Sequence, residues 1–193
     1  KVERGSTEKG PWIATWTVYA NRYKIPADQF YGAGKLDGQP ITIKDTLPAD
    51  GTMSYVPGSA TYTLYANPYD ERKEAEREVA NQSVEGNVSG NEVTFSIPTT
   101  ALGNYAGYVK LTYQTAIKRS VLDTSTNSAT LVNSASAVSG SKTFHSSGEV
   151  TVTIKNNVLQ KTGDQVSNSN RIKYTIRVNE SAVDLKSDSD LLE

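Results

Sequence analysis

Residues 41–47 read Ile-Thr-Ile-Lys-Asp-Thr-Leu, and the turn signal Pro-Ala-Asp-Gly follows at 48–51. Apolar and polar residues alternate from Ile41 to Ile43, so a β-strand through this stretch places Asp45 on the same face as both isoleucines. That face is the core face. A carboxylate in a protein core is costly unless it is paired or protonated, so the interpretation of the chain depends on what faces Asp45.

Length and composition limit the class of protein. A chain of 193 residues is long enough for one good-sized domain, or for one domain and part of another. The net charge of −1, with basic residues spread along the chain, does not favour binding to nucleic acid or to an anionic membrane. A hydrophobic content of 36 % with 11 Tyr, 14 Gly and 7 Pro is typical of β-sandwiches with polar outer faces. The absence of cysteine excludes disulfides, thiolate metal sites and cysteine nucleophiles.

Short runs of β-branched and aromatic residues, separated by turn signals, recur along the chain. The predicted strands are 12–21, 41–45, 60–65, 92–97, 105–117, 129–132, 142–144 and 149–154. Seven or more such strands predict an all-β, immunoglobulin-like β-sandwich. Residues 70–80 are rich in Glu, Arg, Lys and Ala and are predicted to form one short, solvated surface helix. No apolar run approaches the ~18 residues that a membrane-spanning helix needs.

One sequence motif occurs twice. The pattern aromatic, Thr, β-branched, any residue, small apolar, Asn is found at residues 16–21 and again at 174–179. A lysine precedes each copy, Lys1 by 15 residues and Lys161 by 13. We interpret this as an internal repeat, with one complete domain over residues 1–155. Residues 156–193 are then a linker and the opening strand or strands of a second, truncated repeat.

The two ends of the first domain carry residues that could react beside Asp45. An immunoglobulin-type sandwich places its first and last strands side by side; here these ends carry Lys1 and the segment 126–131, which contains Asn127. In an apolar core, desolvation lowers the pKa of an amine and raises that of an acid. A neutral lysine can then attack the Asn carboxamide while a protonated carboxyl polarises its C=O. Ammonia leaves, and an amide crosslink remains.

In order and spacing, the sequence resembles the collagen-adhesin type of immunoglobulin-like domain found in cell-wall-anchored adhesins of Gram-positive bacteria. The residues that carry the resemblance are Lys1, 16–21, 41–45 and 127–129, and the Lys-Thr-Gly-Asp at 161–164 is similar to the opening of a following domain. The resemblance implies an intramolecular Lys–Asn isopeptide bond. By position it implies Lys1 as the nucleophile, Asn127 as the electrophile and Asp45 as the proton shuttle, with Lys9 as a rival nucleophile.

The same resemblance implies a structural or adhesive module on the bacterial cell surface, anchored to the cell wall through regions absent here. Its implied partners are a host matrix protein such as collagen and the adjacent tandem domains of the same chain, without nucleic acid and without membrane insertion. The implied chemistry is a single self-crosslinking event rather than turnover, so we do not expect an enzyme, a cofactor or a metal site. Without an acid of its own repeat, Lys161 is expected to stay unreacted.

Plainer interpretations stay open for each of these residues. Asp45 could be an exposed acid at a strand end, Lys1 a disordered terminal lysine, and Asn127 a turn residue within the polar segment 123–128. Trp12 and Trp16 are expected in the core rather than on a sugar-binding platform. The alternative function is a carbohydrate-binding β-sandwich of a secreted enzyme, because the many tyrosines could supply exposed aromatic rings.

Overall fold

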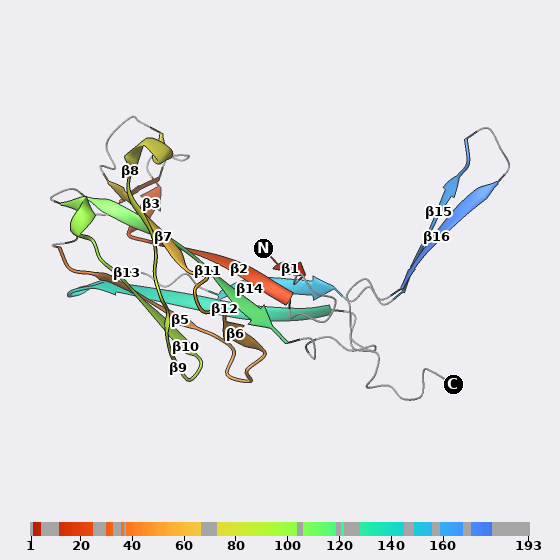
Figure 1. Cartoon of the computed structure of the whole chain (residues 1–193), viewed down its shortest axis with the longest axis horizontal. Helices are drawn as coiled ribbons and strands as arrows, with labels where there is room; N and C mark the ends of the chain where they lie inside the picture. Colours follow the sequence, from red (N-terminus) through yellow and green to blue (C-terminus); the bar gives the residue numbers. More distant parts are fainter. Residues whose placement is uncertain are drawn as a thin grey trace.

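The structure is a computed structural model of the whole chain that describes residues 2–4, 12–24, 30–32, 36, 38–66, 73–103, 106–118, 121, 128–144, 149–155, 159–167 and 171–178. These residues form mainly antiparallel strands, most of them in two six-stranded sheets (Figure 1). The two sheets enclose a common hydrophobic core. The predicted all-β, immunoglobulin-like sandwich is therefore confirmed.

The first sheet is built around one long strand. Its order is β1-β2-β11-β7-β8, and β6 also pairs with β11. The strands are β1 (Val2–Arg4), β2 (Trp12–Ala20), β6 (Met53–Tyr55), β7 (Thr61–Ala66), β8 (Glu78–Ser83) and β11 (Gly107–Ile117). Strand β11 pairs with all of β2 and places Tyr113 opposite Trp16. The aromatic motif of the sequence thus lies in an inner strand, where one of its faces covers the core.

The second sheet carries the acid. Its order is β13-β12-β5-β10-β9, and β14 also pairs with β12. The strands are β5 (Ile41–Thr46), β9 (Asn87–Ser89), β10 (Glu92–Ile97), β12 (Ser128–Ser139), β13 (Lys142–Phe144) and β14 (Glu149–Lys155). Strand β5 lies between β10 and β12, so Asp45 is opposite Val93 on one side and Ala135 on the other. The strand predicted at 129–132 is the first part of the longer β12.

Alternation along β5 determines what enters the core. Ile41, Ile43 and Asp45 are all fully buried, whereas Lys44 points outward and forms an ion pair with Glu92. The prediction that Asp45 shares the core face is confirmed, and its interpretation as an exposed strand-end acid is wrong.

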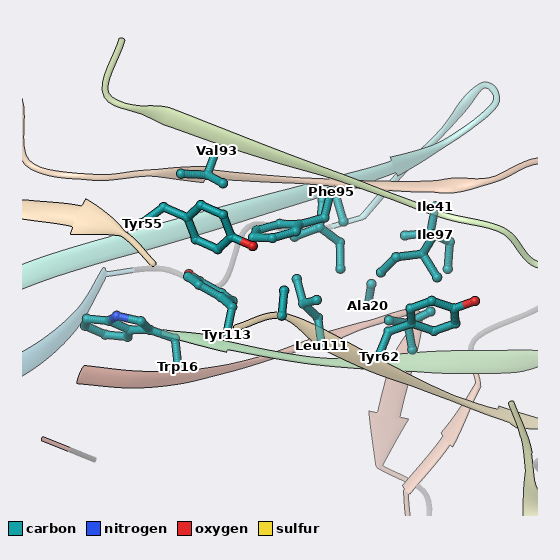
Figure 2. Packing of buried hydrophobic residues seen from close by; sticks show 14 of the residues in the cluster. Trp16, Ala20, Ile41, Tyr55, Tyr62, Val93, Phe95, Ile97, Leu111 and Tyr113 are labelled. Atoms are coloured by element: carbon teal, nitrogen blue, oxygen red, sulfur yellow. The ribbon is translucent and has the colours of Figure 1, made fainter. Parts of the chain in front are cut away.

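Aromatic side chains fill the space between the sheets near Asp45. The Phe95 ring packs edge-on against Tyr55, with 5.6 Å between the centroids, and lies 5.1 Å from the Tyr113 ring (Figure 2). Trp12 and Trp16 are also buried, as predicted, so neither indole is available for a sugar. Trp16 donates a hydrogen bond from Nε1 to Thr115 Oγ1 at 2.8 Å, which fixes the indole beside Tyr113. The acid therefore lies among large, closely packed rings.

The short surface helix predicted at residues 70–80 is present, but it is shorter than predicted. Glu74–Arg77 forms one 3-10 turn, η1, and β8 begins directly afterwards, while residues 70–72 lie outside the described part of the chain. The segment lacks the apolar stripe through which a helix gains most of its stability, and pairing with β7 supplies backbone hydrogen bonds instead. A second 3-10 turn, η2, spans Thr100–Leu102. In the described residues, no helix has the length and apolar character needed to cross a membrane.

Two hairpins complete the described chain. Strands β3 (Arg22–Lys24) and β4 (Phe30–Gly32) form a small one. Strands β15 (Leu159–Gln165) and β16 (Ile172–Val178) form another, drawn in blue apart from the two large sheets in Figure 1. In this second hairpin the apolar residues at alternate positions of β16 are more than half exposed: Ile172, Tyr174, Ile176 and Val178. The motif at 174–179 therefore begins in the second strand of an antiparallel pair, as the motif at 16–21 does, but its apolar face is uncovered.

Candidate functional site: a buried Asp, Asn and Tyr

Three polar side chains meet between the sheets. The Asn133 side-chain nitrogen Nδ2 lies 3.3 Å from Asp45 Oδ2 and 3.2 Å from the Tyr113 hydroxyl oxygen, and donates to both. Asp45 and Tyr113 are fully buried, and Asn133 is 4 % exposed. Asp45 and Asn133 come from the second sheet and Tyr113 comes from the first, so this cluster bridges the two layers.

Strand register brings Asn133 to the acid. Ala135 of β12 lies opposite Asp45, and Asn133 is two residues earlier on the same face of β12. Alternate residues of this strand point inward, because Leu131, Asn133, Ala135 and Ala137 are all buried. The same alternation is visible in the sequence. Extending the predicted strand beyond residue 132 would have identified Asn133 as a core asparagine.

A cavity of about 300 Å³ adjoins the cluster. Its walls come from both sheets, and its lining residues are Thr15, Trp16, Thr17, Val18, Asp45, Tyr113, Asn133, Ser134, Ala135, Val150, Thr151 and Val152. No amine is present in this set of described residues. The cavity thus offers room for an additional side chain beside an acid and a carboxamide, between β2 of one sheet and β14 of the other.

Burial makes the acid of this site unusually weak. It raises the pKa of Asp45 to about 6, although hydrogen bonding with Tyr113 and Asn133 partly opposes the rise. The pKa of the Tyr113 hydroxyl is also raised well above its ordinary value, by burial first and then by the charge of Asp45. Tyr113 therefore keeps its proton, and Asp45 keeps its proton to a higher pH than an ordinary carboxyl does; in its protonated form each is a hydrogen-bond donor.

Two acceptor atoms of the cluster have no hydrogen-bond partner among the residues that the structure describes. Asp45 Oδ1 and Asn133 Oδ1 are both buried and unpaired. Unpaired buried acceptors are costly, and in folded proteins the great majority of such atoms are paired. The described residues therefore do not supply enough hydrogen-bond donors for this site. Protonation of Asp45 would add one donor, and an amine in the cavity would add others.

Three residues proposed from the sequence lie outside the described chain: Lys1, Lys9 and Asn127. Their positions are therefore not tested. Of the sequence-predicted site, the structure describes Asp45 alone, and it pairs that acid with an asparagine and a tyrosine that sequence reasoning did not single out. Asn133 carries the alternation signal described above. Tyr113 was placed correctly in a strand, but nothing in the sequence distinguished its hydroxyl from those of the other tyrosines.

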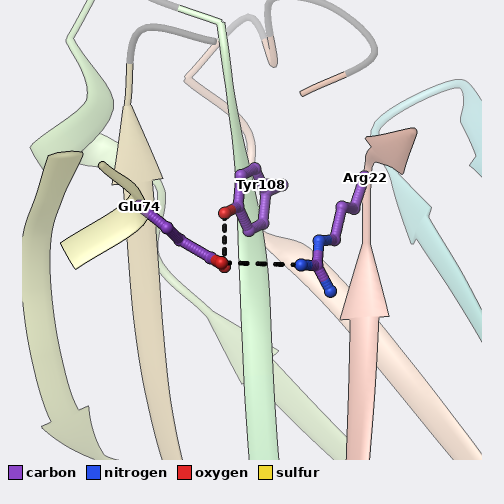
Figure 3. Close-up of polar contacts among 3 residues, drawn as sticks. All are labelled: Arg22, Glu74 and Tyr108. Carbon is purple, nitrogen blue, oxygen red and sulfur yellow. Dashed lines mark hydrogen bonds and ion pairs between the residues drawn. The ribbon is translucent and has the colours of Figure 1, made fainter. Parts of the chain in front are cut away.

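A second polar cluster lies on the outer face of β11. The Tyr108 hydroxyl donates to Glu74 Oε1 at 2.6 Å, and Arg22 forms an ion pair with Glu74 at 3.6 Å (Figure 3). The Arg22 guanidinium also lies 3.8 Å from the Tyr19 ring centroid. Because Tyr108 and Tyr113 are five positions apart in one strand, their side chains point to opposite faces. In the described residues, no group of acids and histidines could hold a metal ion.

Comparison with known proteins gives likeness of structure only. No protein-family model matches the sequence, and no curated protein matches it. Among solved structures, the backbone protein of group B streptococcus pilus 2b aligns with a TM-score of 0.41 and 14 % identity over 80 % of this chain and 55 % of that one. The N-terminal domain of the Streptococcus gordonii adhesin Sgo0707 aligns with a TM-score of 0.43 and 14 % identity, over 75 % of this chain and 29 % of that one.

A third similar structure is the collagen-binding domain from a Staphylococcus aureus adhesin. It aligns with a TM-score of 0.38 and 14 % identity, over 81 % of this chain and 95 % of that domain. The chain spans about half or less of the first two proteins. Likeness of this degree does not identify a reaction or a partner, so the functional argument rests on the geometry of the site.

The pKa values of the two acids at the ends of segment 45–50 should be shifted in opposite directions from the ordinary value of an aspartate. Asp45 is expected to titrate near pH 6, whereas Asp50 should titrate below its usual range because the Thr52 backbone N–H and hydroxyl both donate to its Oδ1. Carboxyl ¹³C chemical shifts measured against pH report both groups in one sample. A midpoint near 4 for Asp45 would contradict the burial argument.

The raised pKa also has a consequence for stability. Since the folded-state pKa exceeds the unfolded value of about 3.9, the folded protein binds more protons between these two pH values. The free energy of unfolding should therefore fall as the pH rises from about 4 to about 6, by up to about 3 kcal/mol. Asp45→Asn is expected to remove this fall, as measured by denaturant unfolding across the range.

Proposed function

We propose that this chain is a structural or adhesive module of a bacterial surface protein, stabilised by an intramolecular Lys–Asn isopeptide bond that forms once. The observation that carries the proposal is the contact between Asp45 and Asn133, a weak acid and a carboxamide buried together beside a cavity of about 300 Å³. A buried acid whose pKa is raised to about 6 keeps its proton to a higher pH than an ordinary carboxyl, and a protonated acid is the group needed to activate a carboxamide toward an amine. The site is used up by its own product, so the chain is not an enzyme in the sense of turnover.

The proposed reaction balances with the groups of the site. A neutral lysine Nζ attacks Asn133 Cγ, and the C=O electron pair moves to Oδ1. Asp45 gives its proton to the amide nitrogen, which departs as ammonia when its bond to Cγ breaks. The Asp45 carboxylate then takes a proton from the new N–C linkage, so that Asp45 ends in the form in which it began. Exclusion of water by the surrounding core keeps the amine neutral and strengthens each of these contacts.

Lys1 is the proposed nucleophile because β1 lies next to β2 at the cavity. Val2 of β1 is opposite Ala14 of β2, and the next four residues of β2 line the cavity. The second hairpin gives independent support. There Lys161 is opposite Ile176, which corresponds in the repeat to Val18, a cavity-lining residue. In the repeat, a lysine of the first strand thus lies opposite the position that lines the cavity in the first domain; this supports Lys1 by analogy, and Lys9 stays the rival.

Asn133 replaces Asn127 as the proposed electrophile. Asn127 lies outside the described residues, whereas Asn133 is in contact with the acid. A six-residue separation within an extended segment corresponds to roughly 20 Å at about 3.3 Å per residue. An asparagine that far along the chain would need a different path to reach Asp45, so the contact already present favours Asn133.

The crosslink would act on the chain as a disulfide does. It would join the first strand to β12 and close a loop of more than a hundred residues. On the loop-entropy model such a closure stabilises the fold by about 4 to 5 kcal/mol, mainly by restricting the unfolded chain. Because the chain has no cysteine, an amide bond that cannot be reduced would supply this stability in an extracellular setting.

The proposal includes location and partners, on the basis of the sequence resemblance. We infer an extracellular position at the surface of a Gram-positive bacterium, and a host matrix protein such as collagen as partner. We also infer that residues 1–155 form the complete domain and that β15 and β16 open a second repeat, because their exposed apolar face is what an isolated hairpin cannot stabilise. Saturable binding of the full chain to immobilised collagen tests the matrix partner; absence of binding would restrict the role to a stalk.

Intact mass tests the crosslink. The folded wild-type chain is expected to be lighter than its sequence mass by about 17 Da, the mass of ammonia. Asp45→Ala and Asn133→Ala should each restore the full mass, because the acid or the electrophile is gone. Lys1→Ala should do the same if Lys1 is the nucleophile, and Lys9→Ala if the rival is correct.

Two matched variants serve as controls for this measurement. Asn127→Ala and Lys161→Ala should keep the mass deficit, since neither residue takes part in the proposed reaction. A folded wild-type chain at full sequence mass would contradict the crosslink altogether. A deficit that survives Asn133→Ala but disappears in Asn127→Ala would return the electrophile to Asn127.

A further inference from the structure

We propose that Tyr113 is a catalytic residue of the crosslinking reaction, and that its hydroxyl forms with Asp45 a two-donor oxyanion hole for the Asn133 carbonyl oxygen. This inference rests on the proposed function above, since it concerns the same site. It adds a group from the opposite sheet to an acid and an asparagine that both come from one sheet.

The geometry places both oxygens at one amide atom. Tyr113 Oη and Asp45 Oδ2 lie 3.2 Å and 3.3 Å from the same terminal atom of the Asn133 side chain. With an ionised Asp45 that atom is the NH₂ group, which donates to both. Once Asp45 is protonated, both neighbours are O–H donors and require an acceptor. A half-turn of the amide about Cβ–Cγ exchanges nitrogen and oxygen without moving the heavy-atom positions, and it places the carbonyl oxygen between the two donors.

This arrangement meets the requirements of an oxyanion hole. Negative charge develops on the carbonyl oxygen when an amine attacks Cγ, and fixed donors in a site without water stabilise that charge strongly. A carboxylic acid kept neutral by burial can serve as one such donor beside a phenol. Tyr113 keeps its proton throughout the reaction. Asp45 holds its proton in a hydrogen bond to the carbonyl oxygen while the amine attacks, and passes it to the amide nitrogen of the tetrahedral intermediate as that nitrogen leaves, so the proton balance given above is unchanged.

Other described groups near the site are engaged elsewhere. The Trp16 Nε1–H donates to Thr115 Oγ1 at 2.8 Å, and therefore does not face the amide. In the described part of the chain, the side chains to which Asn133 donates hydrogen bonds are those of Asp45 and Tyr113. Tyr113 itself is fixed by its inner strand and by the Phe95 ring 5.1 Å away, so its hydroxyl is held ready before the reaction begins.

The rate of crosslinking in the full chain tests this assignment. The chain is made by cell-free synthesis, samples are quenched in acidic denaturant over time, and the fraction that has lost ammonia is read by intact mass. Removal of one oxyanion donor usually slows a reaction by about 10²–10³-fold, so Tyr113→Phe should crosslink roughly a hundredfold more slowly than wild type. Tyr108→Phe is the matched control, because it removes a buried hydroxyl from the same strand on the opposite face. Its rate should equal that of wild type.

The pH profile distinguishes a role in the chemistry from a role in packing. Crosslinking needs protonated Asp45, so its rate should fall as the pH rises through the pKa of that acid. The Tyr113 hydroxyl lowers the pKa of Asp45, and its loss should therefore move this descending limb to higher pH. A change in packing alone would slow the reaction without moving the limb.

The outcomes separate the two levels of the proposal. A wild-type chain that never loses ammonia would overturn the crosslink itself. A wild-type chain that loses it, with Tyr113→Phe equally fast and unshifted in pH, would overturn the role of Tyr113 alone. If Tyr113→Phe does not fold, 3-fluorotyrosine at position 113 keeps the ring and makes the phenol a stronger donor. A faster reaction then supports the oxyanion hole, and an unchanged rate contradicts it.

Discussion

The structure depends on one constraint: a carboxyl group is held at the centre of an apolar sandwich. Asp45 is fully buried between two neighbouring strands, with an aromatic wall facing it from the other sheet. A charged carboxylate there would be strongly destabilising, so the fold favours the protonated form and the pKa rises. The polar residues around it, Asn133 and Tyr113, are the groups with which a neutral carboxyl can exchange hydrogen bonds.

A buried polar cluster of this kind does not stabilise the fold by itself. An apolar residue in place of Asp45 would fill the core without unpaired acceptors, and buried polar clusters are often neutral or destabilising beside apolar replacements. The cluster has a use if it forms a covalent bond that then stabilises the fold by more than the cluster costs. On that account the buried acid and the asparagine are the groups that the proposed reaction requires.

The sequence predicted the parts of the structure that follow from alternation. The strand carrying Asp45, the burial of that acid and the core position of both tryptophans could be read from a period of two. The helix predicted at 70–80 was extended too far, because residue propensity was weighed above the missing apolar stripe; pairing with β7 makes residues 78–83 a strand. Asn133 was missed because the strand was ended too early. Tyr113 could not have been identified, because its hydroxyl has meaning only through a contact between two sheets.

The most direct measurement is tandem mass spectrometry of a tryptic digest of the folded chain. Cleavage at Arg and Lys leaves Asn127 and Asn133 together in the peptide spanning residues 120–142, and Lys1 in the peptide that ends at Arg4. The proposed reaction predicts one branched peptide that joins these two, with fragment ions that place the bond at Asn133. Unlinked peptides from a folded, wild-type chain, or fragment ions that place the bond at Asn127, would contradict it.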